Sequence, residues 1–293
     1  MKVEAVRQFF IRSIWDYFQT EGRTHLPWRV TRDPYAICVS EFMLQQTQVE
    51  RVIPKYEAWL SAFPTWEVLA AAATADVLRL WSGLGYNSRA LRLKKLAETV
   101  VARYQGVLPQ SQEDLQALPG IGPYTTAALQ AFAFEQEVAV VDTNIERIVL
   151  RFFLAVPSAD REAVVAILMK VIGEQRYPLP FARFFFQALM DFGSHICKAK
   201  PLCQACPLRS QCKAFATQQF AVKRPKQSHF PHSRRYYRGL LLKLLKDRDQ
   251  LSWTELAAVD IQGYQWSDVV ATLAKDGLIT VHEKDGRYVT LPR

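Results

Sequence analysis

The spacing of apolar side chains predicts that residues 1 to about 215 are almost wholly helical. Apolar residues recur every three or four positions, as on a helix with one buried face. The clearest runs are Val6, Phe9, Phe10, Ile14, Trp15 and Phe18, and Leu84, Leu91, Leu96, Val100 and Tyr104. Ala70 to Leu80 is alanine-rich with an apolar stripe, and prolines divide the chain into pieces of helical length. Only Val138 to Val141 has strand character, too short for a sheet, so we expect a mainly α fold.

The pattern changes after residue 215. Residues 216–235 lack apolar periodicity and contain two prolines, which is typical of a linker. Beyond it the pattern predicts three helices and a hairpin, near Tyr236–Lys246, Trp253–Val259, Ser267–Lys275 and the Asp285-Gly286 turn. This is the element order of a winged helix, so residues 236–293 are predicted to form a winged-helix-like α+β domain. A small α+β cap with no role in DNA binding would show the same pattern.

Length and composition are those of an ordinary globular protein. The chain has 293 residues, of which 49% are apolar and 22% charged, enough for two domains and too apolar for disorder. No stretch approaches the roughly 18 unbroken apolar residues of a membrane-spanning helix. The amphipathic, acid-bearing amino terminus is unlike a signal peptide. We therefore expect a cytoplasmic protein, or a nuclear one if the cell has a nucleus, with no membrane partner. We also expect a monomer.

The positive charge is concentrated in one segment. The formal net charge is +9, and nine basic residues against one acid between Lys223 and Arg248 supply +8 of it. A basic segment of this kind can bind a polyanion such as nucleic acid, although basic linkers are often merely solvated.

Four of the five cysteines lie within sixteen residues, spaced C-x5-C-x2-C-x5-C, and they are Cys197, Cys203, Cys206 and Cys212. A cytosolic chain would not keep them as disulfides, so the spacing indicates thiolate ligation of an iron–sulfur cluster or another metal. Zinc also accepts four thiolates and stays an alternative. The isolated Cys38 is expected to be a buried core residue.

Two carboxylates and a glycine turn are the remaining candidates for chemistry. Gly120 and Gly122 allow a tight turn, after which amides at the start of the next helix, near Thr125, can face a phosphate. Asp142 precedes a helical segment, where a helix cap is the ordinary role. Glu41 is either an exposed helix residue or, if buried in its apolar surroundings, a carboxyl with a raised pKa. A proton-donating and an ionised carboxylate together can cleave a glycosidic bond.

The motifs, taken in order, resemble one enzyme family. The turn, the downstream aspartate and the cysteine tail resemble the base-excision DNA glycosylase superfamily that includes endonuclease III. The MutY family of adenine glycosylases is the most similar branch. The matching segments cover residues 1 to about 215, and they are LPWR (26–29), SEFMLQQTQV (40–49), WSGLGY (81–86), LPGIGPYT (118–125), VDTNI (141–145) and FFQALMDFGSHIC (185–197).

This resemblance implies a two-lobed helix-hairpin-helix glycosylase that takes double-stranded DNA containing a mismatch or lesion between its lobes. One lobe would be a [4Fe-4S] cluster domain made of residues 1–28 and 136–215. The other would be a six-helix domain of residues 29–135. The target adenine would be flipped out of the duplex, because its glycosidic bond is unreachable inside the stack. Such a protein would be associated with the nucleoid.

The resemblance also assigns roles to residues. Glu41 would protonate adenine N7, and Asp142 would stabilise the positive sugar, with Asn144 and Tyr124 positioning the reacting groups. Four residues match positions of the family's base pocket, and they are Trp28, Arg29, Leu44 and Gln187. Gln46 and Tyr86 match side chains that wedge into the base stack. Tyr124 stands where endonuclease III-like enzymes have a Schiff-base lysine, so base removal without efficient strand cleavage is expected.

Three departures from the family pattern limit these expectations. The family spacing begins C-x6-C, whereas five residues separate Cys197 from Cys203. Asn87 stands where an aromatic residue is usual. The tail after residue 216 is too short and wrongly patterned for the family's carboxy-terminal domain that recognises 8-oxoguanine.

Other functions stay open on the sequence alone. The chain could be a glycosylase for another mispaired base, such as thymine or uracil opposite guanine. It could also be a non-catalytic DNA-binding regulator or, least in keeping with its length, a ferredoxin-like electron carrier.

Overall fold

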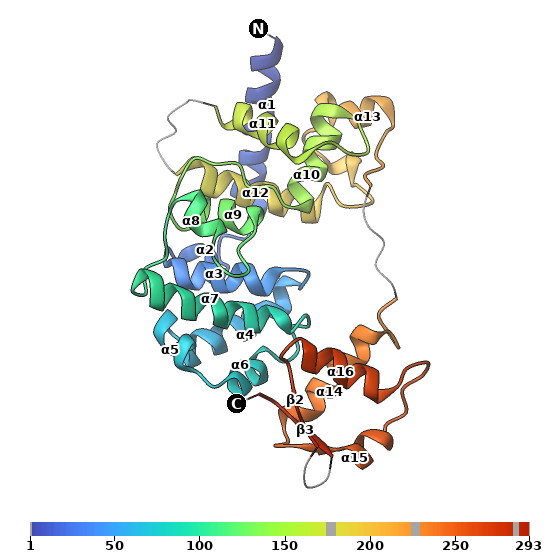
Figure 1. The fold of residues 1–293 in the computed structure, drawn as a ribbon. Helices are drawn as coiled ribbons and strands as arrows, with labels where there is room; N and C mark the ends of the chain where they lie inside the picture. The colour runs from blue at the N-terminus through green and yellow to red at the C-terminus, as the bar shows by residue number, and fades with distance from the viewer. Residues whose placement is uncertain (1, 174–179, 224–228, 284–286, 293) are drawn as a thin grey trace. The chain divides into compact units, whose positions relative to one another are not determined.

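A computed structural model describes residues 2–173, 180–223, 229–283 and 287–292 of the chain. Its regular structure is helical except for a small three-stranded sheet near the carboxyl end (Figure 1), which confirms the mainly α prediction. The chain divides into two compact units. Unit 1 consists of Met1–Ile37, Gln110–Gln116 and Ile121–Pro225. Unit 2 consists of Cys38–Pro109, Ala117–Gly120 and Lys226–Arg293. The functional division at residues 28, 135 and 215 stays a prediction.

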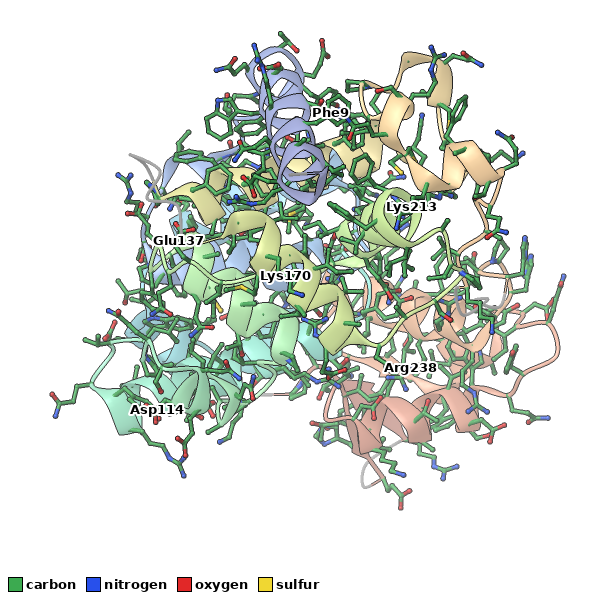
Figure 2. The ribbon with its side chains drawn as sticks, turned by 90° about the horizontal axis from the view of Figure 1, so that it is seen from above. Phe9, Asp114, Glu137, Lys170, Lys213 and Arg238 are labelled. Carbon is green, nitrogen blue, oxygen red and sulfur yellow. The ribbon has the colours of Figure 1, made fainter. Side chains whose placement is uncertain are left out.

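Unit 1 is built around a pair of long helices, α1 and α12. Helices α1 and α10 both pack on α12, and α13 packs on the single π-helical turn η1. The core is aromatic, since the Phe10 ring lies 4.8 Å from Phe152 and 6.2 Å from Phe185. Figure 2 adds side chains and labels Phe9 on α1 and Lys213 at the start of α13. The elements are α1 (Lys2–Glu21), α2 (Pro27–Val30), the start of α3 (Pro34–Leu44), α8 (Gln112–Gln116), α9 (Pro123–Phe132), α10 (Thr143–Val149), η1 (Leu150–Leu154), α11 (Arg161–Ile172), α12 (Phe181–His195), η2 (Cys203–Ala205), η3 (Arg209–Gln211) and α13 (Lys213–Thr217).

The first part of unit 2 is a helical bundle centred on α7. Helices α5 and α6 pack on α7, and α4 packs on α6. Two buried indoles, Trp59 and Trp81, meet edge to face at 5.4 Å in its core. The elements are the rest of α3, then α4 (Val49–Ala62), α5 (Trp66–Ala71), α6 (Thr74–Trp81) and α7 (Ser88–Tyr104).

The carboxy-terminal part of unit 2, from Arg234 onward, has the predicted order of three helices and a hairpin. We refer to it as the C-terminal module. Its strands form an antiparallel sheet in the order β1-β3-β2, with Val281 opposite Val289. The short strand β1 was not predicted, and the Asp285-Gly286 turn lies outside the described residues. The elements are α14 (Arg234–Lys246), β1 (Leu251–Ser252), α15 (Trp253–Ala257), α16 (Trp266–Lys275), β2 (Thr280–His282) and β3 (Tyr288–Thr290).

Two helix boundaries differ from the sequence pattern. The alanine-rich stretch from Ala70 to Leu80 is not one helix, because Ala72 and Ala73 are extended, with ψ of 143° and 138°. The helix expected from Leu84 begins only at Ser88, because the turn before it places Gly83, Gly85 and Tyr86 at positive φ. Within the described residues, no helix combines the length and apolar character needed to cross a membrane.

Candidate functional site

Asp142 is the N-cap of α10, as its sequence position suggested. Its Oδ1 accepts hydrogen bonds from the backbone N–H groups of Asn144 at 2.8 Å and Ile145 at 2.7 Å. Its Oδ2 accepts one from Asn144 Nδ2 at 2.9 Å. Burial raises the pKa of the Asp142 carboxyl, against the opposing effects of these hydrogen bonds and of Arg147. The carboxylate is therefore fixed in orientation by the helix that it caps.

Asn144 is held in turn by Arg147, one turn further along α10. Arg147 Nη2 donates to Asn144 Oδ1 at 2.7 Å and to the Gly193 carbonyl at 2.7 Å, and Nε donates to the Cys197 carbonyl at 2.6 Å. A Cβ on Gly193 would lie 2.6 Å from the Asn144 Cβ, so only glycine allows this approach. The Arg147 guanidinium therefore links Asn144, which is bonded to Asp142, to the backbone of Cys197 within unit 1.

Arg29, one of the predicted pocket residues of unit 1, forms a buried ion pair with Asp191. Arg29 donates to both Asp191 carboxylate oxygens, at 2.6 and 2.9 Å, and Arg23 Nε donates to Oδ1 at 2.7 Å. Burial acts to raise the pKa of Asp191, but the two guanidiniums outweigh it and hold the pKa below its usual value. Trp28 and Gln187 are also buried, and Gln187 lies one helical turn before Asp191 on α12. Arg29 is therefore committed to Asp191, which the sequence did not single out.

Glu41 lies on α3 in unit 2 and is 6% exposed, so the buried alternative for this carboxyl is the observed one. Its neighbours along the helix, Phe42 and Met43, are buried too. Burial, with the Glu41 charge adding to it, raises the pKa of the Cys38 thiol, and Cys38 is the buried core residue that the sequence predicted. Leu44, at the end of the helix, is half-buried.

The two predicted wedge residues occupy turns with left-handed backbone. Gln46 has φ +56° and Tyr86 has φ +46°, conformations that cost free energy in residues with a Cβ. Gln46 is exposed, and Tyr86 is 40% exposed. We call these segments the 44–48 turn and the 82–87 turn.

Arg89 connects the two turns through hydrogen bonds of its guanidinium. Its Nη1 donates to the carbonyl oxygens of Phe42, Met43 and Gln45 at 2.7, 3.0 and 2.7 Å. Its Nη2 donates to Thr47 Oγ1 at 3.1 Å and to the carbonyls of Leu84 and Gly85, both at 3.0 Å. The Arg89 guanidinium also lies 5.7 Å from the centre of the Tyr86 ring. This 4% exposed arginine positions both turns, and sequence reasoning missed it.

The two glycines of the predicted phosphate turn have different surroundings. Gly120 has φ +79°, and a Cβ there would lie 3.2 Å from both the Phe42 ring and Arg92 Cβ, so this glycine is required by packing. Gly122, the N-cap of α9, has φ −102°, and a Cβ there would meet no atom within 4 Å. The space before α9 is therefore open at Gly122. Thr125 is buried as a whole residue, and Tyr124 is half-buried.

The four predicted ligand cysteines lie in one loop of unit 1, from Cys197 to Cys212, and none forms a disulfide. Arg151, buried on η1, holds this loop by donating to the carbonyls of Lys198 at 2.5 Å and Ala199 at 2.9 Å. The same guanidinium lies 3.5 Å from Cys197 Sγ. Burial, together with the charges of the other thiols, raises the pKa of Cys206 to about 12. A bound cation would favour the thiolate form of Cys206 at neutral pH.

The surroundings of the cysteine loop suit an anionic metal–thiolate centre, a description that covers both an iron–sulfur cluster and a four-thiolate zinc site. In the described parts of the chain, no three cysteine, histidine or carboxylate side chains lie close enough to share one metal ion. Four thiolates around zinc would lie about 4 Å from one another. The Arg151 guanidinium supplies positive charge and a donor to the Cys197 sulfur, as an anionic metal–thiolate centre requires.

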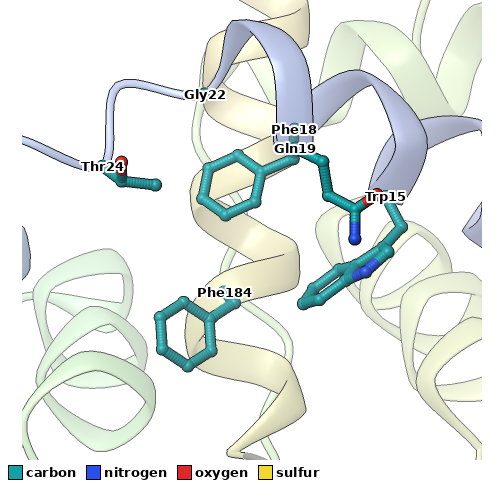
Figure 3. Close-up of a pocket in the computed structure, with 6 residues that line it drawn as sticks. All are labelled: Trp15, Phe18, Gln19, Gly22, Thr24 and Phe184. Atoms are coloured by element: carbon teal, nitrogen blue, oxygen red, sulfur yellow. The ribbon is translucent and has the colours of Figure 1, made fainter.

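A hollow of about 270 Å³ in unit 1 contains none of the predicted site residues. Figure 3 shows its lining side chains, which come mainly from α1 and α12 and are Trp15, Phe18, Gln19, Gly22, Thr24 and Phe184. Its aromatic walls offer little for chemistry on a polar substrate.

Comparison with known proteins places the chain in a family. Residues 39–174 match the model of the HhH-GPD superfamily base excision DNA repair protein. The adenine DNA glycosylase of Mycolicibacterium smegmatis is 37% identical over 91% of this chain and 91% of its own length. That of Buchnera aphidicola is 33% identical over 91% of this chain and 77% of its own. The chain belongs to the adenine DNA glycosylase family. This confirms the resemblance seen in the motifs.

Other adenine DNA glycosylases and solved structures extend this result. The human adenine DNA glycosylase is 38% identical, over 70% of this chain and 39% of its own length. A thermostable thymine-DNA glycosylase has a TM-score of 0.68 and 29% identity over 74% of this chain and all of its own. An endonuclease III–DNA complex has a TM-score of 0.62 at 22% identity, covering 72% of this chain and 95% of its own, which shows the shared fold.

Proposed function

We propose that this member of the adenine DNA glycosylase family hydrolyses the N-glycosidic bond of adenine mispaired with 8-oxoguanine or guanine in double-stranded DNA. The observation that carries the proposal is the Asp142 cap, whose carboxylate is oriented by Asn144 and Arg147 while Glu41 is buried on α3. A purely DNA-binding protein or an electron carrier needs neither carboxylate. The protein acts as a monomer.

Asp142 stabilises the sugar as the bond to the base breaks. The electron pair of the glycosidic bond leaves with the base, and positive charge develops on the sugar at C1′ and its ring oxygen. A carboxylate held by three hydrogen bonds needs no reorganisation to face this charge. Water then adds to C1′ and loses a proton, which completes the hydrolysis.

Glu41 supplies the proton that makes adenine a better leaving group. Its burial on α3 shields it from bulk water, and we assign it the role of general acid. Protonation at N7 draws electrons from the glycosidic bond, so the base departs as neutral adenine. The deprotonated Glu41 can then accept the proton of the attacking water.

The other predicted residues hold the extruded nucleotide and the duplex. Trp28, Leu44 and Gln187 match the family's adenine-contacting positions, and the Arg29 side chain is held in place by Asp191. Gln46 and Tyr86 fill the gap in the base stack. The amides at the start of α9 contact a phosphate across the space open at Gly122, as helix amino ends do.

Two further features complete the proposal. Cys197, Cys203, Cys206 and Cys212 hold a [4Fe-4S] cluster, which cross-links the loop and takes no part in hydrolysis. Residues 118–126 contain Tyr124 and no lysine, so no Schiff base forms there and strand cleavage is inefficient.

The test is a base-pair panel with enzyme in excess over labelled duplex, followed by alkali. We expect alkali-dependent breaks at adenine opposite 8-oxoguanine and guanine, little cleavage without alkali, and none at adenine opposite thymine. Intact adenine strands at every enzyme excess would overturn the proposal.

Two variants with matched controls assign the carboxylates. Asp142→Asn keeps a good N-cap residue but loses the negative charge, so the protein should fold and lose activity about a hundredfold or more. Asp160→Asn changes another N-cap, which is exposed and makes no capping hydrogen bond, and should stay active. Glu41→Gln should lose about 10²- to 10⁴-fold, whereas Glu57→Gln, at an exposed position on α4, should not.

The likeness to a thymine-DNA glycosylase supports a second candidate, removal of thymine or uracil opposite guanine. Pyrimidines have no N7, so this activity would survive Glu41→Gln. Breaks at thymine or uracil but not at adenine in the same panel would favour it.

A further inference from the structure

The C-terminal module contacts the turn that carries Tyr86. Arg235 Nη1, in the first turn of α14, donates a hydrogen bond to the Tyr86 hydroxyl at 2.8 Å. These residues are 149 positions apart in the chain and both belong to unit 2. A weaker contact accompanies it, with Arg79 on α6 at 4.0 Å from the Asp249 carboxylate. A side chain predicted to enter the base stack is therefore held by a module whose role the sequence left open.

Tyr86 is held at both ends. At its base, the backbone has φ +46° and is fixed by the hydrogen bonds of Arg89 to the Leu84 and Gly85 carbonyls. At its tip, the hydroxyl is bound by Arg235. The ring is 40% exposed, so it can reach DNA while both ends stay fixed. Since the left-handed backbone is costly for tyrosine, a bond at the tip adds to what keeps the ring in this orientation.

Arg235 also belongs to an aromatic group formed by the start of the module and the segment just before it. Its guanidinium lies 5.9 Å from the ring centre of Phe230, which is 56% exposed. Phe230 meets Tyr236 edge to face at 5.8 Å. Exposed aromatic rings beside an arginine are surfaces on which unstacked bases can lie. The group formed by Arg235, Phe230 and Tyr236 is therefore better suited to bind unstacked bases than to bind the backbone of an intact duplex.

We propose that Arg235 is a positioning residue for Tyr86, through which the C-terminal module contributes to the recognition of the mispair. The inference rests on the proposed function, in which Tyr86 enters the stack beside the mispair. Arg235 holds the Tyr86 ring at the angle that insertion requires. The module then affects the excision step itself, in addition to any general attraction for DNA from its basic residues.

The test is a double-mutant cycle on the full-length protein. Arg235→Gln removes the donor, Tyr86→Phe removes the acceptor and keeps the ring, and a third protein carries both changes. We measure single-turnover excision of adenine opposite 8-oxoguanine and guanine at saturating enzyme. Each single change should lower this rate about tenfold, the size expected for one charge-assisted hydrogen bond, and the double change should lower it no further.

The matched control is Arg287→Gln in the same module. Arg287 is exposed, and its guanidinium lies 4.9 Å from the ring centre of Trp253. Replacing it by glutamine therefore removes the same charge and the same kind of aromatic contact as Arg235→Gln. It should leave the excision rate at saturation unchanged. A structural readout accompanies activity, because amide hydrogen exchange in residues 82–87 should rise in Arg235→Gln and not in Arg287→Gln.

The possible failures are distinguishable. If the wild-type protein excises no adenine, the proposed function is overturned. If it excises adenine but Arg235→Gln matches Arg287→Gln in rate and exchange, only this inference is overturned. Losses that multiply in the double variant would also overturn it, because the two residues would then act independently.

Discussion

Replacing Arg89 by methionine removes the hydrogen bonds that join the 44–48 turn to the 82–87 turn. The side chain is 4% exposed, so water cannot readily replace the lost donors. Carbonyl oxygens of Phe42, Met43, Gln45, Leu84 and Gly85 would each lose a charged donor. Methionine fills much of the arginine volume, which limits the effect to the lost polar contacts.

The expected loss of stability follows from these contacts. A hydrogen bond to a charged group contributes about 1.5–3 kcal/mol, and a buried polar group left unpaired costs about 1–3 kcal/mol. The contributions are not additive, and some carbonyls will turn to other donors. We therefore expect about 4 kcal/mol for Arg89→Met, a shift in Tm of about 8–16 °C. Arg89→Lys should cost about 2 kcal/mol, because an ammonium cannot reach both turns as the planar guanidinium does.

The assay is thermal and denaturant unfolding of the two variants, with Arg103→Met as control. Arg103 is exposed near the end of the same helix and should change stability by less than about 0.5 kcal/mol. Excision at saturating enzyme should also fall in Arg89→Lys, since both predicted wedge residues lie on turns that it holds. If Arg89→Met unfolds within about 1 kcal/mol of the wild type, Arg89 does not fix the turns.

Three further predictions concern unit 1. The pKa of Asp191 is held below its unperturbed value of 3.8, so its ion pairs stabilise the fold fully above that pH and lose their contribution as the pH falls toward the lowered pKa. Unfolding measured as a function of pH should show this loss of stability in acid for the wild type and not for Asp191→Asn. Because burial raises the pKa of Asp142, the acid limb of the excision rate should lie above pH 3.8 and should not simply follow acid unfolding, which circular dichroism at each pH checks. Arg147→Met should lower the single-turnover rate about tenfold through Asn144, and full iron content in this variant would separate that effect from loss of the cluster.

Sequence patterns predicted the elements that depend on local chemistry. The helical spacing of apolar residues located the main helices, and Asp142 caps α10 as an aspartate before a helical segment should. Burial of Glu41 was one of two alternatives, decided only by the packing of α3. The break at Ala72 and Ala73 was missed, because alanine favours helix and nothing in the local sequence marks an end.

The arginines that bind backbone carbonyls were also missed, and for a different reason. Arg89, Arg147 and Arg151 bind carbonyl oxygens of other segments, and such contacts depend on how distant parts of the chain meet. In a sequence, an arginine on an amphipathic helix is expected at the surface. One usable signal was that Arg89 lies between Ala90 and the glycine-rich turn, in a stretch where apolar residues dominate the buried face.

The contrast between Gly120 and Gly122 bears on how inherited changes in such a protein would behave. A side chain at Gly120 must adopt a left-handed backbone and press on Phe42 and Arg92, so the altered chain should be less stable and less abundant. A methyl group at Gly122 meets no atom within 4 Å, so that chain should accumulate normally. Under our proposal that the start of α9 contacts a DNA phosphate, the Gly122 change would weaken DNA binding and the Gly120 change would lower abundance, although only one residue separates them.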